Sequence, residues 1–315
     1  MEGAQAADAA SCKPLQFINS VKMTTNADRS RFYVPVSING VPKTLLLDTG
    51  GGKTQITEDV AKELKLAESI DLEAPDMRDL YGHKSYKMAH VESFELGNQR
   101  GRNFYIHIDP MPADWANAGG DAVGVLSNDL FQQYDVDFDF AAQRLNYFSQ
   151  DHCEGRVAYW PERPLAILPF ELRDRHISVD VTLDGKVFHA ILDTGSPVTT
   201  TGVTDVVNAF HFERGSSDLP VIKEDEKNPN VKIYGHNFER LSLGDITVLH
   251  PQIQLFPYVR AYQHGLDVSD LEQVIVGINV MRQLHIYVAF GEKKLYITPA
   301  GNGESALFKA AGASP

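Results

Sequence analysis

Two identical tripeptides hold the residues of this chain whose types suit acid–base chemistry. Asp48-Thr49-Gly50 follows the apolar run Leu45-Leu46-Leu47, and Asp193-Thr194-Gly195 follows Ala190-Ile191-Leu192. Two carboxyl groups held close together cannot both ionise cheaply, so such a pair shares one proton. One carboxylate can then take a proton from a water molecule while its protonated partner hydrogen-bonds a peptide carbonyl oxygen. The repeated tripeptide therefore predicts a site that hydrolyses peptide bonds without a metal or a covalent intermediate.

Each aspartate stands at the end of a predicted β-hairpin. Asn39-Gly40 precedes Asp48 by the same interval at which Asp184-Gly185 precedes Asp193. Asn-Gly and Asp-Gly favour two-residue turns between paired strands. Each half of the chain therefore reads as a strand, a tight turn, a second strand and then the aspartate.

The repeat extends well beyond the aspartates. Three further segments recur in the same order: Tyr81-Gly82-His83 and Tyr234-Gly235-His236, Leu96-Gly97 and Leu243-Gly244, and residues 125–129 and 275–279. Duplication on this scale indicates two similar lobes related by a pseudo-twofold axis, which can bring equivalent side chains together. Short apolar runs separated by Gly, Asn, Asp and Pro predict strands. Helices are expected only at 57–66, with Thr57 as N-cap, and more weakly at 201–210.

These residues resemble the aspartic peptidases of the pepsin and retropepsin group, in their single-chain, two-lobed form. The resemblance covers Phe32 to Pro299 and is greatest to small bacterial retropepsin-like enzymes fused in tandem. It implies an all-β fold of two similar retropepsin-like β-barrel lobes related by a pseudo-twofold axis, with short helices. One aspartate from each lobe would meet at the floor of a cleft beneath a β-hairpin flap.

The resemblance also implies a division of the chain and a set of site residues. We expect an N-terminal extension at 1–30, a first lobe at 31–148, a linker at 149–165, a second lobe at 166–299 and a disordered tail at 300–315. The expected site residues are the catalytic Asp48 and Asp193, the threonines Thr49 and Thr194 that bond across the lobe boundary, the closely approaching glycines Gly50 and Gly195, Ser196, which bonds the outer oxygen of Asp193, and the substrate-binding flap residues Tyr81 and Gly82.

Two departures from the family pattern lie in the first lobe. Gly51 stands where the second lobe has Ser196, and Ser127 stands where it has Gly277. With no hydroxyl beside Asp48, the two aspartates should be inequivalent and the proton should rest on Asp48, because a hydrogen bond to a carboxylate favours its charged form. The same departures support an alternative, namely a catalytically inactive peptide-binding or structural protein that retains the fold.

The cysteines bear on the cellular compartment. Cys12 and Cys153 are the chain's two cysteines and flank the first repeat. Since the resembled family is commonly secreted, we expect them to form a disulfide, with two free thiols as the alternative. The expected location is the periplasm or the extracellular space, with a signal peptide already removed.

Composition disfavours several other functions. The net charge is −13 and no basic cluster is present, so nucleic acid is an unexpected partner. No apolar stretch reaches the length of a membrane span, and the eleven histidines show no metal-binding spacing, so no metal or cofactor is expected. Gly51-Gly52-Lys53-Thr54 resembles the end of a phosphate-binding loop, but Leu47 occupies the position that requires glycine. The expected partner is a peptide or protein substrate, bound by a monomer.

Overall fold

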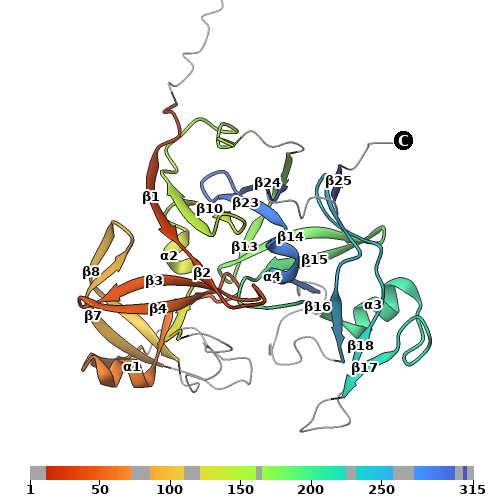
Figure 1. The fold of residues 1–315 in the computed structure, drawn as a ribbon, viewed down its shortest axis with the longest axis horizontal. Coiled ribbons are helices and arrows are strands. Elements are labelled where there is room, and N and C mark those ends of the chain that lie inside the picture. Colours follow the sequence, from red (N-terminus) through yellow and green to blue (C-terminus); the bar gives the residue numbers. More distant parts are fainter. Residues whose placement is uncertain are drawn as a thin grey trace, which may run out of the picture.

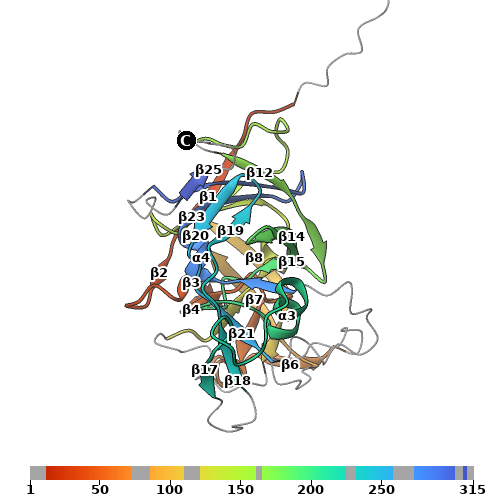
Figure 2. The same cartoon turned by 90° about the vertical axis from the view of Figure 1, so that its right-hand side faces the viewer.

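The computed structural model describes residues 12–71, 86–109, 121–160, 165–224, 232–257 and 273–301, together with the backbone of 308–310. Within these residues the protein consists mainly of β-strands, arranged as two lobes and a sheet to which both lobes contribute (Figures 1 and 2). The all-β, two-lobed fold that the family resemblance implies is confirmed.

The first lobe contains an eight-stranded sheet in the described residues, in the order β2-β3-β4-β9-β5-β8-β7-β6. The strands are β2 (Thr24–Thr25), β3 (Phe32–Ile38), β4 (Val41–Leu47), β5 (Gln55–Thr57), β6 (Ala67–Ile70), β7 (Lys87–Leu96), β8 (Gln99–Asp109) and β9 (Gly124–Leu126). Two short helices, α1 (Glu58–Glu63) and α2 (Asn128–Phe131), follow β5 and β9.

The second lobe contains a sheet in the order β17-β18-β21-β16-β22-β15-β14-β19-β20-β25, with β13 paired to β14. The strands are β13 (Glu171–Arg173), β14 (His176–Leu183), β15 (Lys186–Leu192), β16 (Thr199–Gly202), β17 (Val221–Glu224), β18 (Lys232–Gly235), β19 (Arg240–Leu243), β20 (Ile246–Leu249), β21 (Ile253–Phe256), β22 (Val274–Val276) and β25 (Phe308–Ala310). Its helices are α3 (Val203–Phe210) and α4 (Ile278–Met281).

The two lobes repeat one strand-pairing pattern. β4 runs parallel to β9 as β15 runs parallel to β22, and β5 and β16 pair antiparallel with the same partners. The β3–β4 hairpin turns at Asn39 and Gly40 with φ of 49° and 80°, and the β14–β15 hairpin turns at Asp184 and Gly185 with φ of 43° and 83°. Positive φ at both turn residues matches the twist of the flanking strands. Both predicted hairpins are therefore present.

A six-stranded sheet joins the lobes. Its order in the described residues is β1-β11-β10-β23-β24-β12, comprising β1 (Phe17–Lys22), β11 (Arg144–Phe148), β10 (Asp135–Asp139), β23 (Leu284–Ala289), β24 (Lys294–Pro299) and β12 (Ala166–Pro169). At its centre β10 pairs antiparallel with β23, so backbone hydrogen bonds link the two repeats directly. β1 lies within the predicted N-terminal extension, and β25, within the tail predicted to be disordered, pairs with β20.

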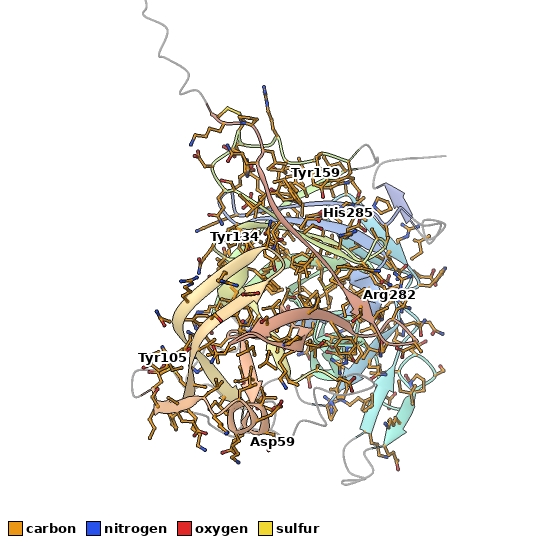
Figure 3. All side chains as sticks on the ribbon, turned by 60° about the vertical axis from the view of Figure 1, so that its left-hand side comes forward. Asp59, Tyr105, Tyr134, Tyr159, Arg282 and His285 are labelled. Carbon is orange, nitrogen blue, oxygen red and sulfur yellow. A yellow bond between two sulfur atoms is a disulfide. The ribbon has the colours of Figure 1, made fainter. Side chains whose placement is uncertain are left out.

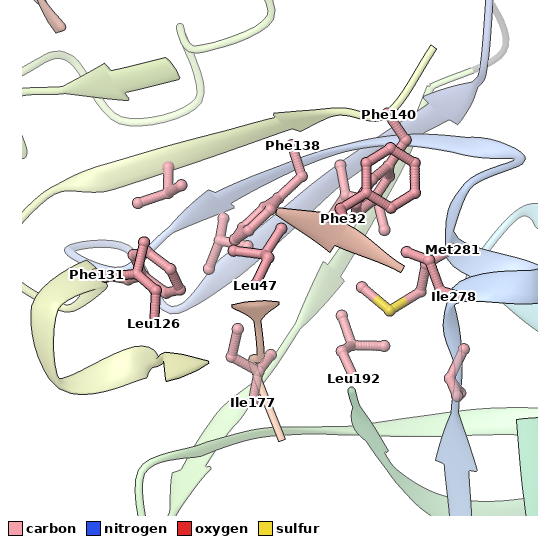
Figure 4. Close-up of a cluster of buried hydrophobic side chains, with 14 of the residues drawn as sticks. Phe32, Leu47, Leu126, Phe131, Phe138, Phe140, Ile177, Leu192, Ile278 and Met281 are labelled. Carbon is pink, nitrogen blue, oxygen red and sulfur yellow. The ribbon is translucent and has the colours of Figure 1, made fainter. Parts of the chain in front are cut away.

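A buried apolar cluster continues from the first lobe into the second (Figure 4). It includes Leu47 and Leu192, the residues that directly precede the two aspartates, and each is at most 1% exposed. Leu126, at the end of β9, belongs to the same cluster. Full burial of one leucine side chain contributes roughly 1.5–3 kcal/mol. The core therefore fixes the strand ends from which the two aspartate loops start.

The joining sheet also carries buried polar groups from both lobes. The Asp137 carboxylate on β10 accepts a hydrogen bond from the Tyr159 hydroxyl, and its other oxygen lies 2.6 Å from Nε2 of His285 on β23. Figure 3 shows Tyr159 and His285 close together on this sheet. Because Tyr159 belongs to the predicted linker, this segment packs on the joining sheet and adds a polar contact between the lobes.

The helices differ in length from the sequence pattern. α1 ends at Glu63 because Leu64 caps it and Lys65 adopts a φ of 53°, so the expected helix at 57–66 is shorter than predicted. Thr57 is at the N-cap without a side-chain hydrogen bond. α3, at the position of the helix expected at 201–210, begins at Val203 and is longer than α1. It buries Val203 and Val206 against the second lobe.

Candidate active site

Asp48 and Asp193 begin equivalent loops at the ends of β4 and β15. The N–H of Asp48 donates to the carbonyl of Leu126 at 3.0 Å, and the N–H of Asp193 donates to the carbonyl of Val276 at 3.0 Å. Both acceptors end the strand that runs parallel to the aspartate's own strand. The pairing of the sheet therefore sets the two aspartate backbones in the same way.

Threonines fasten the two loops to each other. The N–H of Thr49 donates to Oγ1 of Thr194 at 3.0 Å, and the N–H of Thr194 donates to Oγ1 of Thr49 at 3.1 Å. The hydroxyl of Thr49 donates to the Leu192 carbonyl at 2.7 Å, and that of Thr194 to the Leu47 carbonyl at 2.9 Å. Both threonines are at most 1% exposed, so breaking these bonds would leave unpaired buried groups. The structure thus brings the two predicted threonines together across the lobe boundary.

Gly50 and Gly195 lie directly against the carboxyl groups of the opposite loops. A Cβ atom at Gly50 would stand 2.2 Å from Cγ of Asp193, and one at Gly195 would stand 2.5 Å from Oδ1 of Asp48. Any larger residue would push the carboxyls out of place. The two glycines therefore permit the close approach of the aspartates.

The two carboxyl groups are close enough to hydrogen-bond each other. Both aspartates keep part of their surface open to solvent. Desolvation of the Asp48 carboxyl, together with the charge and the hydrogen bond of Asp193, raises the pKa of Asp48 well above its usual value, against the opposing effect of the Gly50 and Gly51 N–H groups. Oδ1 of Asp193 accepts the N–H of Gly195 at 2.8 Å and the N–H of Ser196 at 3.1 Å. This arrangement favours the protonated form of the Asp48 carboxyl within the pair.

The Ser196 hydroxyl does not have the partner predicted from the sequence. It donates to the carbonyl of Val198 at 2.8 Å rather than to Asp193, because the turn after Ser196 brings that carbonyl within reach of the short side chain. Ser196 contacts Asp193 through its backbone N–H instead. Burial and the charge of Asp193, not this hydroxyl, raise the pKa of Asp48, and the inequivalence of the two aspartates stays a prediction.

Two basic side chains that the sequence motifs did not indicate reach across the lobe boundary. The Arg31 guanidinium donates to the Gly195 carbonyl, and Nε2 of His176 lies 2.9 Å from the Gly50 carbonyl. Arg31 and His176 are separated by the same interval as Asp48 and Asp193; Arg31 directly precedes β3, and His176 is the first residue of the equivalent strand β14. Each lobe therefore holds the glycine carbonyl of the other loop. A position-by-position comparison of the two repeats would have found this pair.

Further polar residues support the loops from behind. Thr54 donates through Oγ1 and N–H to Oδ1 of Asp129, and Thr199 makes the same two bonds to Oδ1 of Asn279. Burial raises the pKa of Asp129. Asn128 donates to the Thr49 carbonyl at 2.6 Å, a bond that the apolar residue at the equivalent second-lobe position cannot make. The repeated segment 125–129 was the sequence signal for this group.

The predicted flap residues, Tyr81 and Gly82, lie outside the residues that the structure describes. Among the described residues, no group of three or more His, Cys, Asp or Glu side chains could hold a metal ion. No helix in the described part of the chain is long and apolar enough to cross a membrane.

Cys12 and Cys153 form a disulfide, so the predicted pairing is confirmed. Next to it, Nε2 of His152 lies 2.6 Å from the buried Asp135 carboxylate on β10. The disulfide therefore ties the first described residue of the chain to the sheet that joins the lobes.

Comparison with known proteins agrees with an aspartic-protease-like fold. A family model described as aspartyl protease matches residues 34–130, a range that includes Asp48 but not Asp193. Among 411 matching chains of solved structures, basic 7S globulin from soybean superposes with a TM-score of 0.51 at 9% sequence identity, covering 95% of this chain and 100% of the globulin chain. No curated protein matches the sequence.

Proposed function

We propose that this chain, which has an aspartic-protease-like bilobal fold, is an aspartic endopeptidase that hydrolyses peptide bonds with a water molecule activated between Asp48 and Asp193. The observation that supports the proposal most strongly is the carboxyl pair. Its members lie in hydrogen-bonding contact, and burial with mutual repulsion raises the pKa of Asp48. Gly50 and Gly195 leave room for that contact.

In the proposed reaction the Asp193 carboxylate takes a proton from the water, whose oxygen attacks the peptide carbonyl carbon. Asp48 donates its proton to the carbonyl oxygen as negative charge develops there. Asp193 then passes its proton to the leaving nitrogen as the C–N bond breaks. One proton of the tetrahedral intermediate returns to Asp48, so the pair ends the cycle with a single shared proton.

Substrate, assembly and location belong to the same proposal. We expect a peptide or protein substrate, a monomer, and a flap formed by Tyr81 and Gly82 over the substrate. The Cys12–Cys153 disulfide supports an oxidising compartment, either the periplasm or the extracellular space.

A catalytically inactive peptide-binding or structural protein is the second candidate. It is favoured by Gly51 and Ser127, which depart from the second-lobe pattern, and by a structural neighbour that is named as a globulin rather than as a peptidase. In that protein the carboxyl pair would have only a structural role.

The two candidates differ in whether the protein cleaves peptides. Purified protein should be incubated with denatured proteins and a peptide library between about pH 3 and pH 7. The peptidase proposal predicts cleavage that falls to background in both Asp48→Asn and Asp193→Asn, because an amide cannot share the proton. Gly52→Ala is the matched control, since its Cβ would meet only the Asp174 carbonyl at 3.4 Å. Persistent cleavage by either Asn variant contradicts the assignment, and an inactive parent protein supports the second candidate.

A further inference from the structure

The first lobe exchanges a serine and a glycine relative to the second lobe. Behind and beside Asp48 stand Ser127 and Gly51, whereas the equivalent positions near Asp193 are Gly277 and Ser196. Considered one at a time, Gly51 and Ser127 are two losses from the family pattern. The geometry shows that they occupy a common space.

Ser127 fills the space that a side chain at position 51 would need. A Cβ atom on Gly51 would stand 2.4 Å from Oγ of Ser127, and 3.2 Å from Oδ2 of Asp48. The hydroxyl and the outer carboxyl oxygen therefore flank the same small volume. A serine at position 51 cannot coexist with Ser127 in its present position.

The second lobe has no room for a serine at Gly277, the position equivalent to Ser127. A Cβ atom on Gly277 would stand 2.5 Å from the carbonyl carbon and oxygen of Val198, so no side chain fits there. Its hydroxyl lies on the loop instead, where Ser196 donates to Val198.

The Ser127 hydroxyl has no other use among the described residues. Ser127 is completely buried, and its Oγ has no hydrogen-bond partner there. It occupies the N-cap position of α2 without capping the helix, although serine at an N-cap commonly bonds a backbone N–H. Its own N–H is already paired with Oγ1 of Thr54 at 3.0 Å. A buried hydroxyl without a partner is costly.

We propose that Ser127 is a positioning residue: its hydroxyl, which has no hydrogen-bond partner among the described residues, turns toward Oδ2 of Asp48 and donates a hydrogen bond to it across the small volume that both atoms flank. As a positioning role, this inference rests on the proposed peptidase function. The donor orients the outer oxygen of Asp48, so that its inner oxygen and the shared proton face Asp193. The first lobe then has a hydroxyl donor to its aspartate that the second lobe lacks, because the Ser196 hydroxyl donates to Val198.

The role makes a prediction about protonation that is independent of cleavage. A donor to Oδ2 stabilises the charged form, so Ser127→Ala should raise the pKa of Asp48, by about 1. The other ionisable groups around this carboxyl stay in place: Asp193 opposite it, His176 on the Gly50 carbonyl, Arg31 on the Gly195 carbonyl and Asp129 behind Thr54. If the protein cleaves peptides, kcat should fall about tenfold with KM unchanged, and the alkaline limb of the pH–rate profile should move to higher pH.

The measurement is a ¹³C NMR titration of aspartate-labelled protein, with the Asp48 carboxyl assigned from its loss in Asp48→Asn. Ser216→Ala is the matched control, because Oγ of Ser216 is also buried and unpartnered but lies far along the chain from the aspartate loops. We expect a raised pKa of Asp48 in Ser127→Ala and the parent value in Ser216→Ala. An unchanged pKa in folded Ser127→Ala overturns the role of Ser127, whether or not the protein is a peptidase. An absence of cleavage with a shifted pKa overturns only the proposed function.

A swapped variant tests the same claim by a second route. Gly51→Ser alone should be strongly impaired, because its Cβ would clash with Ser127. Gly51→Ser combined with Ser127→Gly removes the clash, but its hydroxyl has the partner that Ser196 uses in the second lobe, the backbone carbonyl two residues further along the loop. This double variant should therefore keep the raised pKa of Asp48 expected for Ser127→Ala, and it tests the role of Ser127 even if Ser127→Ala fails to fold. A folded double variant with the parent pKa of Asp48 contradicts the proposal.

Discussion

The two aspartate loops share their backbone contacts but differ in what surrounds the carboxyl groups. Asp48 and Asp193 donate to equivalent strands, and Thr49 and Thr194 bond each other reciprocally. Both carboxyls accept backbone N–H groups of their own loops, and burial together with the charge of Asp193 raises the pKa of Asp48. The nearby hydroxyls differ, since Ser196 bonds Val198 whereas the Ser127 hydroxyl lies beside the volume next to Asp48.

The comparison separates two requirements of such a site. Shared contacts, which follow from the duplicated sequence, fix the distance between the carboxyls. In the proposed peptidase, contacts that differ would decide which carboxyl holds the proton. A symmetric frame with asymmetric surroundings would then give one acid and one base from two identical residues.

The largest effect is expected at the symmetric glycines. Gly50→Ala and Gly195→Ala place a Cβ 2.2 Å and 2.5 Å from the opposite carboxyl groups. Displacing a catalytic group by about 1 Å costs on the order of 100-fold, so each variant should lose at least that much peptidase activity. Steady-state assays on the folded proteins check this, with Gly52→Ala as control. A fully active Gly50→Ala would show that close contact between the loops is unnecessary.

The next effect concerns a disulfide that encloses the first lobe and has no equivalent in the second. The Cys12–Cys153 disulfide closes a loop over the whole first lobe, with a sequence separation of 141. In the chain-entropy model so long a loop contributes about 5 kcal/mol. Cys12→Ser/Cys153→Ser should therefore unfold at a clearly lower denaturant concentration than the oxidised parent. Reduction should destabilise the parent but not the double variant, and equal midpoints for all samples would show that the disulfide does not stabilise the fold.

Thr49 and Thr194, which bond each other reciprocally, should contribute about equally to the free energy of unfolding. Thr49→Val and Thr194→Val keep the side-chain shape but remove a hydroxyl that donates one bond and accepts another. Each variant should lose about 2–4 kcal/mol of unfolding free energy. Denaturant titration measures both losses against Thr24→Val, an exposed control. A much smaller loss in one threonine variant would break the symmetry of the frame.

The smallest expected effect is a pH-dependent change in thermal stability that follows from the raised pKa of Asp48. The folded-state pKa of Asp48 is raised above its unfolded value, so its contribution to stability is fully present below the unfolded-state pKa and is lost as pH rises through the folded-state pKa. Since asparagine does not ionise, Asp48→Asn should melt a few degrees above the parent near neutral pH, and together with it in acid. Thermal unfolding at both pH values, with the exposed Asp59→Asn as control, tests this sign. Equal melting temperatures at neutral pH would refute it.

Much of the fold could be predicted because its signals are local and occur twice. Asn39-Gly40 and Asp184-Gly185 specify hairpins, and each aspartate follows an apolar strand. The pairing of β10 with β23 could not be predicted, because it depends on contacts between residues far apart in the sequence. The end of α1 was also missed, since the left-handed conformation of Lys65 has no strong sequence signal.

Site residues that belong to a sequence motif could be predicted. Contacts that depend on the direction of a side chain could not. The aspartates, threonines and glycines lie as the tripeptides indicate. Ser196 was given the wrong hydroxyl partner because a serine can rotate toward either Asp193 or Val198. Arg31 and His176 were missed because they act on backbone carbonyls, which leave no motif.

Neutron diffraction from a deuterium-exchanged crystal at about pH 5 would test most directly the claim that the two carboxyls share one proton. The account predicts one deuteron between the two carboxyl groups, bonded to Asp48, with Asp193 unprotonated. Two deuterons, none, or a single deuteron bonded to Asp193 would contradict it.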